Sequence, residues 1–359
     1  MEHHIRTAFG DSASSYGPNP TGLPPQGILQ GNGAGPATWA AITSILVKCM
    51  KAEGYGFSAW SVISQRALSL MCFGFIDDTD LILNSKDPSL PTRELVHNAQ
   101  SELATWEGLI SATGGALAPE KSYWYLIDVN PDGSYNTKAD SPGDLILNNK
   151  GDPVVIERLD VSEAKESLGI WTRPDGAMDN EVAVLKDKAR KWADSVRTKR
   201  ISPTEAWYSV NSTIMKTIEY PLMATCICRK DMQDIMRPIL QAALPKAKIQ
   251  KHFPRKLVYG SLGSEGFGLR NPSTIQLIEH LHAIVCHSHR DSPSHDLHLH
   301  NMEIVQCYVG SEKPFWDLPY CTNSMAPLLP QDGLTSPGVN CRKLLFLSKV
   351  LLILSKPTE

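Results

Sequence analysis

Apolar positions recur at helical spacing in several long stretches of the chain. Residues 91–113 and 180–200 each place apolar side chains three or four residues apart, so each stretch predicts a helix with one buried face. In the first stretch these positions are Leu95, Ala99, Leu103, Trp106, Leu109 and Ile110, and in the second they are Val182, Leu185, Ala189, Trp192 and Val196. Residues 37–50 also predict a helix, and Ser202-Pro203 marks the start of another.

Residues 73–83 follow a different pattern, in which two apolar runs flank an acidic turn. Residues 73–76 read Phe-Gly-Phe-Ile, Asp77 and Asp78 follow, and residues 81–83 read Leu-Ile-Leu. Strand-forming residues on both sides of an Asp turn predict a tight β-hairpin. Adjacent carboxylates repel each other unless a cation lies between them, and a divalent ion with oxygen ligands is the usual solution. The alternative is a solvated turn, since Asp is a common turn residue.

A glycine-rich turn precedes the helix expected over residues 37–50. Residues 30–36 read Gln-Gly-Asn-Gly-Ala-Gly-Pro, and a turn of this kind exposes backbone N–H groups that suit a phosphate. The stretch lacks the Gly-Lys-Ser/Thr of a P-loop, and Pro36 stands where a dinucleotide-binding fingerprint has its third glycine. Taken alone, it also fits a helix start that merely needs glycine.

In this order, the two stretches resemble two consecutive motifs in the palm of reverse transcriptases. The first is Gln-Gly-x-x-x-x-Pro before a helix, and the second is aromatic-x-Asp-Asp on a hairpin. Their amino-acid sequences are similar to those of the same motifs in the RNA-directed DNA polymerases of non-LTR-type retroelements. The resemblance implies that Asp77 and Asp78 are catalytic and hold Mg²⁺ or Mn²⁺, and that Gln30 and Gly31 contact the incoming nucleotide and the template.

Two later stretches are similar to further reverse transcriptase motifs. An Ala-Pro-Glu-Lys-Ser stretch follows a helix and a glycine turn, and the resemblance puts its Lys121 near the triphosphate of the nucleotide. Residues 165–171, with a turn at residues 174–176, resemble the hairpin that grips the primer. In that hairpin a Leu-Gly strand, here Leu168 and Gly169, lets the primer backbone approach closely. A surface lysine and an unremarkable hairpin are the alternatives.

The resemblance implies an α+β fold, in which a partial polymerase palm of antiparallel sheet and helices precedes a mainly helical thumb. The expected regions are a partial palm (1–164), a primer-grip-like hairpin (165–178), a basic thumb-like region (179–250), a His-rich connection-like region (251–322) and a tail of uncertain role (323–359). Residues 130–151 are polar and predict an insertion loop within the palm. Residues 254–269 resemble a segment that follows the thumb in these elements, and no chemistry is attached to it.

Charge is distributed unevenly along the chain. The 359 residues have a net charge of −3, yet residues 179–256 contain 16 Lys and Arg against 8 Asp and Glu. A basic segment in an acidic chain indicates a polyanionic partner, and Lys and Arg there would contact phosphates in a salt-sensitive way. A solvated helical face is the alternative.

The amino-acid composition limits which classes of protein the chain can belong to. Hydrophobic residues at 42% and charged residues at 20% are typical of a globular protein, here large enough for two or three lobes. The eight Cys are scattered, no signal peptide is visible, and no apolar run reaches the ~18–20 residues that cross a bilayer. We therefore expect reduced thiols, an intracellular location (cytoplasm or nucleus) and no membrane partner.

Histidines gather between residues 280 and 300, which hold seven of the eleven together with Cys286. This density raises a zinc hypothesis, but the spacing matches no zinc-binding motif. A helix and loop that happen to be rich in His are the alternative.

The resemblance covers roughly residues 5–322 and begins late in the palm. It includes no counterpart of the metal-binding Asp on an upstream palm strand, nor of the fingers. The acids before Gln30 are Glu2 and Asp11, and Asp11 resembles a linker between the two elements. We therefore expect an N-terminally truncated palm that binds Mg²⁺ poorly. The absent strand is expected to leave an unpaired sheet edge and exposed apolar surface.

Three functions are compatible with these observations, and whether the chain is an enzyme stays open among them. The first is a reverse transcriptase domain for RNA-templated DNA synthesis by two-metal nucleotidyl transfer, impaired as the chain stands. Its partners would be an RNA template, a DNA primer and deoxynucleoside triphosphates. The second is a non-catalytic nucleic-acid-binding remnant, in which Asp77 and Asp78 are only a turn. The third is an unrelated metal-dependent hydrolase that uses the same Asp pair.

Overall fold

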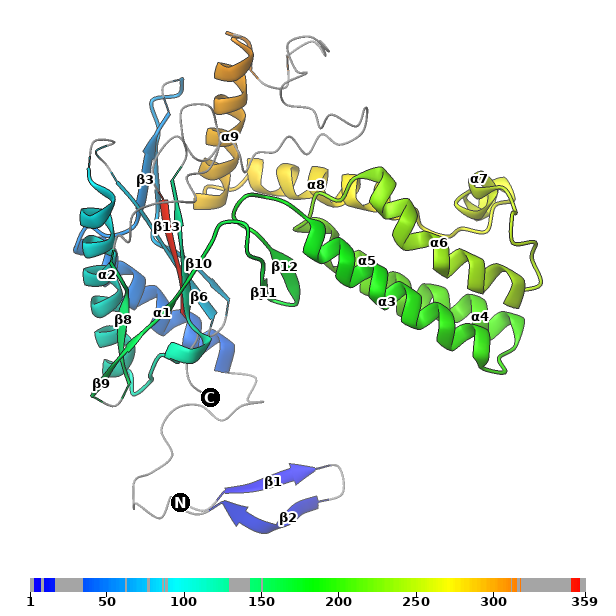
Figure 1. Cartoon of the computed structure of the whole chain (residues 1–359), viewed down its shortest axis with the longest axis horizontal. Coiled ribbons are helices and arrows are strands. Elements are labelled where there is room, and N and C mark those ends of the chain that lie inside the picture. The colour runs from blue at the N-terminus through cyan, green and yellow to red at the C-terminus, as the bar shows by residue number, and fades with distance from the viewer. Residues whose placement is uncertain are drawn as a thin grey trace.

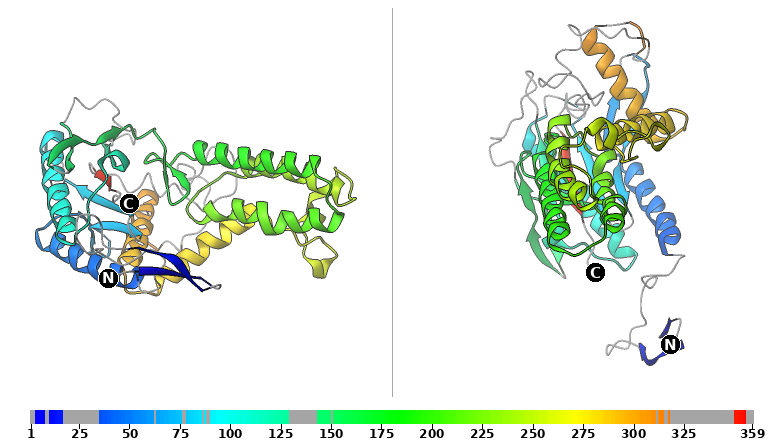
Figure 2. Two further views of the ribbon diagram at one scale, coloured as in Figure 1. Left: turned by 90° about the horizontal axis from the view of Figure 1, so that it is seen from below. Right: turned by 90° about the vertical axis from the view of Figure 1, so that its right-hand side faces the viewer.

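The computed structural model divides into a sheet unit and a helical unit (Figures 1 and 2). It describes residues 3–7, 10–16, 35–61, 63–75, 78–85, 87, 90–128, 143–149, 151–310, 312–314, 317 and 350–355. The sheet unit comprises residues 35–172 and 350–355, and the helical unit comprises residues 179–288. Figure 1 shows the helical unit projecting from one side of the sheet unit. The α+β fold that we expected is confirmed at this level.

A five-stranded sheet forms the centre of the sheet unit. Its strands, in spatial order, are β10 (Glu157–Leu159), β7 (Tyr123–Ile127), β13 (Val350–Ser355), β6 (Asp78–Asn84) and β5 (Cys72–Phe75). β10 is parallel to β7, whereas every other neighbouring pair is antiparallel. β6 and β7 therefore run in the same direction, as expected for strands joined through α2 (Thr92–Ala112), and they are separated by the width of one strand.

β13 fills the space between β6 and β7. Val350 pairs with Asn84 on one side and with Ile127 on the other, and the pairing continues along both neighbours. We had attached no structure to the tail at residues 323–359, and its residues 350–355 supply this central strand, so the inner edges of β6 and β7 are paired. The Val-Leu-Leu-Ile-Leu run has the continuous apolar composition of a strand that is buried on both faces, so it suits this central place.

One face of the sheet is covered by α1 (Gly35–Ala52) and α2, which confirms both predicted helices. The apolar stripe of α2 packs against the side chains that β6 and β7 present on this face. The buried members of this core include Leu95, Ala99, Leu103, Trp106 and Ile110 from α2, and Leu81, Leu83, Trp124 and Leu126 from the sheet. Leu109, the remaining position of the predicted stripe, is only partly buried.

The opposite face is covered only in part. The hairpin of β3 (Phe57–Trp60) and β4 (Ala67–Leu70) packs against it, with Ile82, Tyr125 and Ile127 in the shared core. α9 (Pro293–Val309) lies against β4, where Arg66 and Asp296 form a 3.7 Å ion pair.

Several short elements complete the sheet unit. β8 (Ile146–Asn149) and β9 (Asp152–Val155) form a hairpin where we predicted only an insertion loop, so that prediction is wrong at its C-terminal end. The Gln100 side chain of α2 holds β8, because its oxygen accepts from the Ile146 N–H at 2.7 Å and its amide donates to the Ile146 carbonyl at 3.0 Å. A 3-10 turn η1 (Pro119–Lys121) precedes β7. Outside the sheet unit, β1 (His3–Thr7) pairs with β2 (Gly10–Tyr16) in a separate hairpin.

The helical unit consists of consecutive elements. They are α3 (Asp179–Thr198), α4 (Pro203–Ser209), η2 (Val210–Ile214), α5 (Met215–Glu219), η3 (Tyr220–Met223), α6 (Arg229–Lys246), α7 (Arg255–Val258), η4 (Leu262–Ser264) and α8 (Pro272–Ser288). α3 and α6 run side by side in the same direction, since Lys186 pairs with Asp231 near their starts and the Lys246 ammonium donates to the Lys199 carbonyl at their ends.

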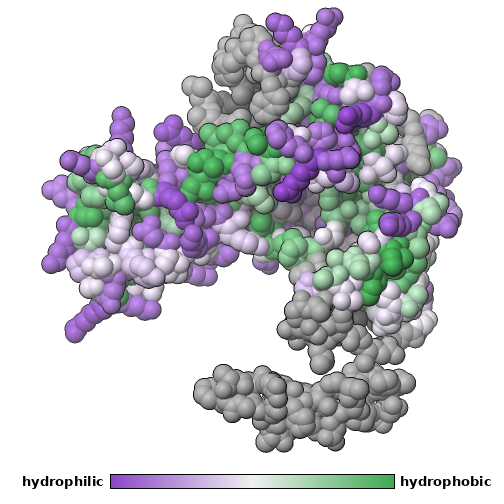
Figure 3. All heavy atoms as spheres, turned by 180° about the vertical axis from the view of Figure 1, so that it is seen from behind, coloured by the Kyte–Doolittle hydropathy of each residue, from purple (hydrophilic) through white to green (hydrophobic). Residues whose placement is uncertain are grey.

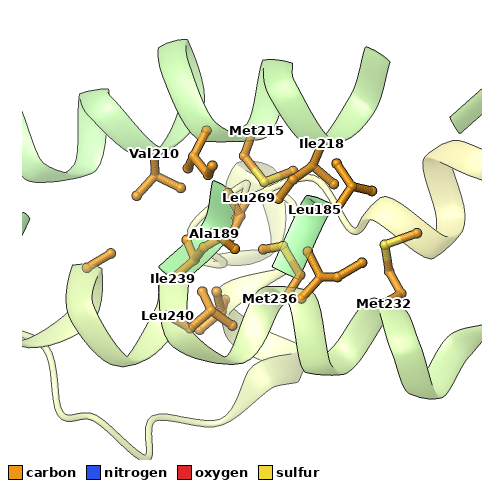
Figure 4. Close-up of a cluster of buried hydrophobic side chains, with 14 of the residues drawn as sticks. Leu185, Ala189, Val210, Met215, Ile218, Met232, Met236, Ile239, Leu240 and Leu269 are labelled. Atoms are coloured by element: carbon orange, nitrogen blue, oxygen red, sulfur yellow. The ribbon is translucent and has the colours of Figure 1, made fainter. Parts of the chain in front are cut away.

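The core of the helical unit lies between α3, α6 and the η2–α5 segment (Figure 4). Leu185 and Ala189 reach it from the predicted apolar face of α3, and Met236 and Ile239 reach it from α6. The predicted helix start at Ser202 is confirmed as a capping box: the Ser202 hydroxyl accepts from the Glu205 N–H at 3.2 Å, and the Glu205 carboxylate accepts from the Ser202 N–H at 2.7 Å.

Candidate functional site

The predicted acidic hairpin is present as β5 and β6. Phe75 pairs with Asp78, and the two residues between them in sequence, Asp77 included, lie outside the described residues. Asp78 and Asp80 are two residues apart on β6 and therefore lie on the same face of the sheet. Their cross-strand partners Phe75 and Phe73 are 56% and 48% exposed, so this end of the face is open to solvent.

Tyr123 lies on the same face as the two carboxylates, two strands away from Asp80. The pairing of Asp80 with Leu354, and of Leu354 with Tyr123, puts all three residues in one row across the sheet. Burial raises the pKa of Tyr123 well above its usual range, and nearby Tyr125, Asp80 and Asp78 raise it further. The phenol therefore stays protonated and is available as a hydrogen-bond donor beside the acidic hairpin.

Two lysines lie at the same end of the sheet. Lys121 is the last residue of η1 and comes two residues before Tyr123, which is in register with Asp80. The Lys165 ammonium lies 5.4 Å above the centre of the Tyr123 ring and forms a 3.2 Å ion pair with Glu157. The described part of the site therefore combines two carboxylates, a phenol and two ammonium groups.

Leu168 and Gly169 form the turn between β11 (Lys165–Ser167) and β12 (Ile170–Thr172). Both have positive φ, at 52° and 77°, which is the pattern of a type I′ hairpin turn. Our placement of this pair inside a strand is therefore wrong, whereas the predicted turn at residues 174–176 is present, closed by the Gly176 N–H on the Arg173 carbonyl at 3.1 Å. The Tyr220 hydroxyl donates to the Leu168 carbonyl at 2.6 Å, so the turn is attached to the helical unit.

Gln30 and Gly31, which we expected to contact the nucleotide and the template, lie outside the described residues. Asp80, Tyr123 and Lys165 were missed by the sequence reasoning. Strand alternation could have put Asp80 on the face of Asp78. No local signal links Tyr123 or Lys165 to the hairpin, because sheet topology alone brings them there.

The helical unit carries many cations without an acidic partner. Of the 16 Lys and Arg between residues 179 and 256, five form ion pairs with described carboxylates: Lys186, Lys191, Arg197, Lys216 and Arg237. The other eleven form no ion pair with any described residue, and they are Lys188, Arg190, Lys199, Arg200, Arg229, Lys230, Lys246, Lys248, Lys251, Arg255 and Lys256. Figure 3 shows hydrophilic side chains over the projecting end of this unit.

The His-rich region does not assemble a metal site in the described part of the chain. No group of three or more His, Cys, Asp or Glu side chains that could hold a metal ion is found among the described residues. His287 of α8 and His298 of α9 stack with their ring centres 5.4 Å apart. Burial, followed by the neighbouring His287 and His295, lowers the pKa of His298. The geometry therefore shows a packed histidine pair at this helix contact.

Comparisons with protein-family models, with curated proteins and with solved structures find no match to this chain. Among the described residues, no helix combines the length and the apolar character needed to cross a membrane.

Proposed function

We propose that this chain is a nucleic-acid-binding protein of the reverse transcriptase type, with the sheet unit as a palm and the helical unit as a thumb. The observation that carries the proposal is the shared face of Asp78 and Asp80 on the β5–β6 hairpin. These carboxylates lie at the end of the sheet where Lys165 begins the hairpin that leads into the helical unit. An acidic centre beside a basic helical arm suits a polymer whose backbone is anionic and whose reaction develops negative charge.

The helical unit supplies the binding part of the proposed function. Its eleven cations without acidic partners can neutralise backbone phosphates irrespective of sequence. The exposed turn at Leu168 and Gly169 lies between the acidic hairpin and these cations in chain order, and Tyr220 holds it in place. This arrangement supports the expectation that the turn lies against the primer strand.

Mg²⁺ or Mn²⁺ is the ion that the resemblance implies at the acidic hairpin. Asp78 and Asp80 fit one such ion, because both are half-buried carboxylates on one strand face, and Mg²⁺ is commonly held by one or two carboxylates and water. When bound, the ion would supply charge stabilisation to a phosphoryl oxygen. The expectation of impaired polymerase activity rests on the resemblance, since Asp77, the other predicted ligand, lies outside the described residues.

The non-catalytic alternative is favoured by a separate observation. The eleven cations lie in the helical unit and make no ion pair with Asp78 or Asp80, so duplex binding does not require the acidic hairpin. The two candidates therefore differ in one respect, which is whether the carboxylates are needed for the chain's activity.

Primer extension and duplex binding by the full chain separate these candidates. With an RNA template, a DNA primer and Mg²⁺ or Mn²⁺, the polymerase proposal expects extension that Asp77→Ala/Asp78→Ala abolishes and the matched Asp152→Ala variant of exposed β9 retains. Affinity for the RNA–DNA duplex should fall roughly 10³-fold between about 50 and 200 mM salt, and equally in all three proteins.

Salt-sensitive binding without any extension would assign the non-catalytic function. Extension that survives loss of the Asp pair would contradict the catalytic role of the hairpin. Binding that is absent, or that does not respond to salt, would contradict both candidates.

A further inference from the structure

A cavity of about 600 Å³ opens on the helical unit, away from the acidic hairpin. Its walls are α6, the short helix α7 and the first turn of α8, all of which are labelled in Figure 1. This volume lies within the range of pockets that hold small organic ligands. The cavity also includes part of residues 254–269, the segment to which no chemistry could be attached from sequence.

Two glycines shape the wall that α7 contributes. Gly266 packs directly on Gly260, since a Cβ added at Gly266 would lie 2.3 Å from the Gly260 carbonyl carbon. The Phe267 N–H then donates to the Leu257 carbonyl at 2.9 Å, so the segment folds back on itself. Phe267 stacks on Phe253 with ring centres 5.0 Å apart, which anchors the segment to the core. Side chains of α7 are thereby held facing α6.

The cavity is lined by cations and by no described acid. Arg229 and Arg237 come from α6, and Arg255 and Lys256 come from α7. Among the described residues that line it, none is Asp or Glu. Arg237 is already paired, at 2.8 Å, with Asp234. The other three form no ion pair with a described residue, so their charge is available to an anion.

Arg255 lies in the wall that α7 contributes. Its Nη2 donates to the Lys251 carbonyl at 3.3 Å, whereas its Nη1 is buried and has no partner among the described residues. Because this nitrogen is closed to solvent, it does not face the open cavity, and Arg255 contributes its charge to the wall rather than that donor. The positive end of α8 adds to the field, although its Ser273 N–H is already capped by the Asn271 side chain at 3.0 Å.

The floor of the cavity is apolar and suited to a flat ring. Met232, Met236 and Leu240 of α6 underlie it, but they are only 2–3% exposed because their side chains belong to the helical core. Tyr259 completes the lining, and burial raises the pKa of its phenol more than nearby Arg255 lowers it. A neutral tyrosine beside thioethers suits an aromatic base, whereas the surrounding cations suit phosphate.

We propose that this cavity binds a nucleoside phosphate, with the phosphate oxygens on Arg229, Arg255 and Lys256 and the base against Tyr259. The ligand is either a free nucleotide or a single nucleotide unit of a strand, and both present the same chemistry. The site shares Arg229, Arg255 and Lys256 with the eleven cations of the proposed function and goes beyond it by assigning these three to one defined cavity and a nucleotide-sized ligand. It shares no residue with the acidic hairpin or with the turn at residues 168–169.

Calorimetric titration of the full-length protein with ATP tests the assignment. The variant Arg229→Gln/Lys256→Gln removes two exposed cavity cations, and Lys48→Gln/Lys51→Gln removes two exposed cations of α1, outside the helical unit and the cavity lining. The cavity variant should lose about tenfold or more in ATP affinity, whereas the matched variant should bind as the parent does. Arg255→Gln should reproduce the loss, with circular dichroism melts showing that each variant is folded.

Inorganic tripolyphosphate and a 12-nucleotide single strand complete the experiment. Tripolyphosphate should bind about tenfold more weakly than ATP, because it cannot use the apolar floor. ATP that displaces the strand would assign a strand unit as the natural ligand, and ATP that binds without displacing it would assign a free nucleotide. The proposal is overturned if ATP does not bind, if both double variants lose affinity equally, or if tripolyphosphate binds as well as ATP.

Discussion

The sheet unit and the helical unit bury their cores by different routes. The helical unit is built from consecutive elements between residues 179 and 288, so its buried contacts join parts of the chain that are close in sequence. The sheet unit needs β13, which pairs Val350 with Asn84 and Ile127 across most of the chain. Local contacts cost little loop entropy, whereas distant strand pairing costs more and depends on every intervening segment. The two units should therefore respond differently to the same kind of damage.

Interrupting β13 should have the largest effect and should separate the two units. In Leu352→Pro the ring removes a backbone N–H from a strand that is paired on both sides, which costs on the order of 3 kcal/mol or more. Amide hydrogen exchange should lose protection throughout β6 and β7 and keep it in α3 and α6. Leu352→Val, which keeps the N–H and the strand preference, is the control. Unchanged protection in β6 and β7 would show that β13 does not hold the sheet together.

A large-to-small substitution in the core of the helical unit tests the same comparison in the other unit. Ile239 is fully buried against α3, and Ile239→Ala should cost about 2–5 kcal/mol of unfolding free energy. Because the core of this unit is local, urea unfolding followed by hydrogen exchange should show the loss in α3 and α6 alone. Exposed Ile278→Ala of α8 serves as the control and should cost far less. A loss of protection that spreads equally into β6 and β7 would contradict the independence of the two units.

The smallest effect expected is a pH dependence confined to the sheet unit. Glu102 of α2 is fully buried and neither carboxyl oxygen has a hydrogen-bond partner of good geometry among the described residues. Burial raises its pKa from 4.5 to about 8, and the nearby backbone N–H of Gly56 opposes this rise only in part. Between these values the folded protein keeps a proton that the unfolded chain releases, so stability falls as pH rises from about 4.5 to 8.

Urea unfolding of the sheet unit at several pH values measures this effect. The unfolding free energy should fall by about 1 kcal/mol for each pH unit within that window, and Glu102→Gln should remove this slope. Exposed Glu94→Gln of the same helix should leave the slope in place. A slope that persists in Glu102→Gln would assign the pH dependence to another group.

The parts of the fold that could be predicted from sequence are the local ones. The apolar spacing of α2 and α3, the capping residues Ser202 and Glu205, and the hairpin at Asp78 are all encoded within a few residues, and all are present. The turn at Leu168 could not be placed, because a leucine with positive φ contradicts the usual turn preferences and is held there by the distant Tyr220.

The candidate sites, like the fold, could be predicted from sequence only where the signal is local. Asp78 could be assigned from its own hairpin, but Tyr123 and Lys165 reach it only through strand order, and strand order depends on a segment at the far end of the sheet unit's sequence. The cavity near Tyr259 could not be predicted either. Its cations are spread over α6 and α7, and only the close contact of Gly260 with Gly266 turns them toward each other.

The place of β13 has a consequence for the growing polypeptide on the ribosome. β6 and β7 are synthesised early, but their inner edges have no partner until residues 350–355 have left the exit tunnel. The helical unit lies between β7 and β13 in sequence, so it can fold before the sheet is complete. Folding would then run against the usual N-to-C order. During that interval two strand edges and the apolar surface around Leu81 are exposed to other chains, and chaperone binding would be most useful there.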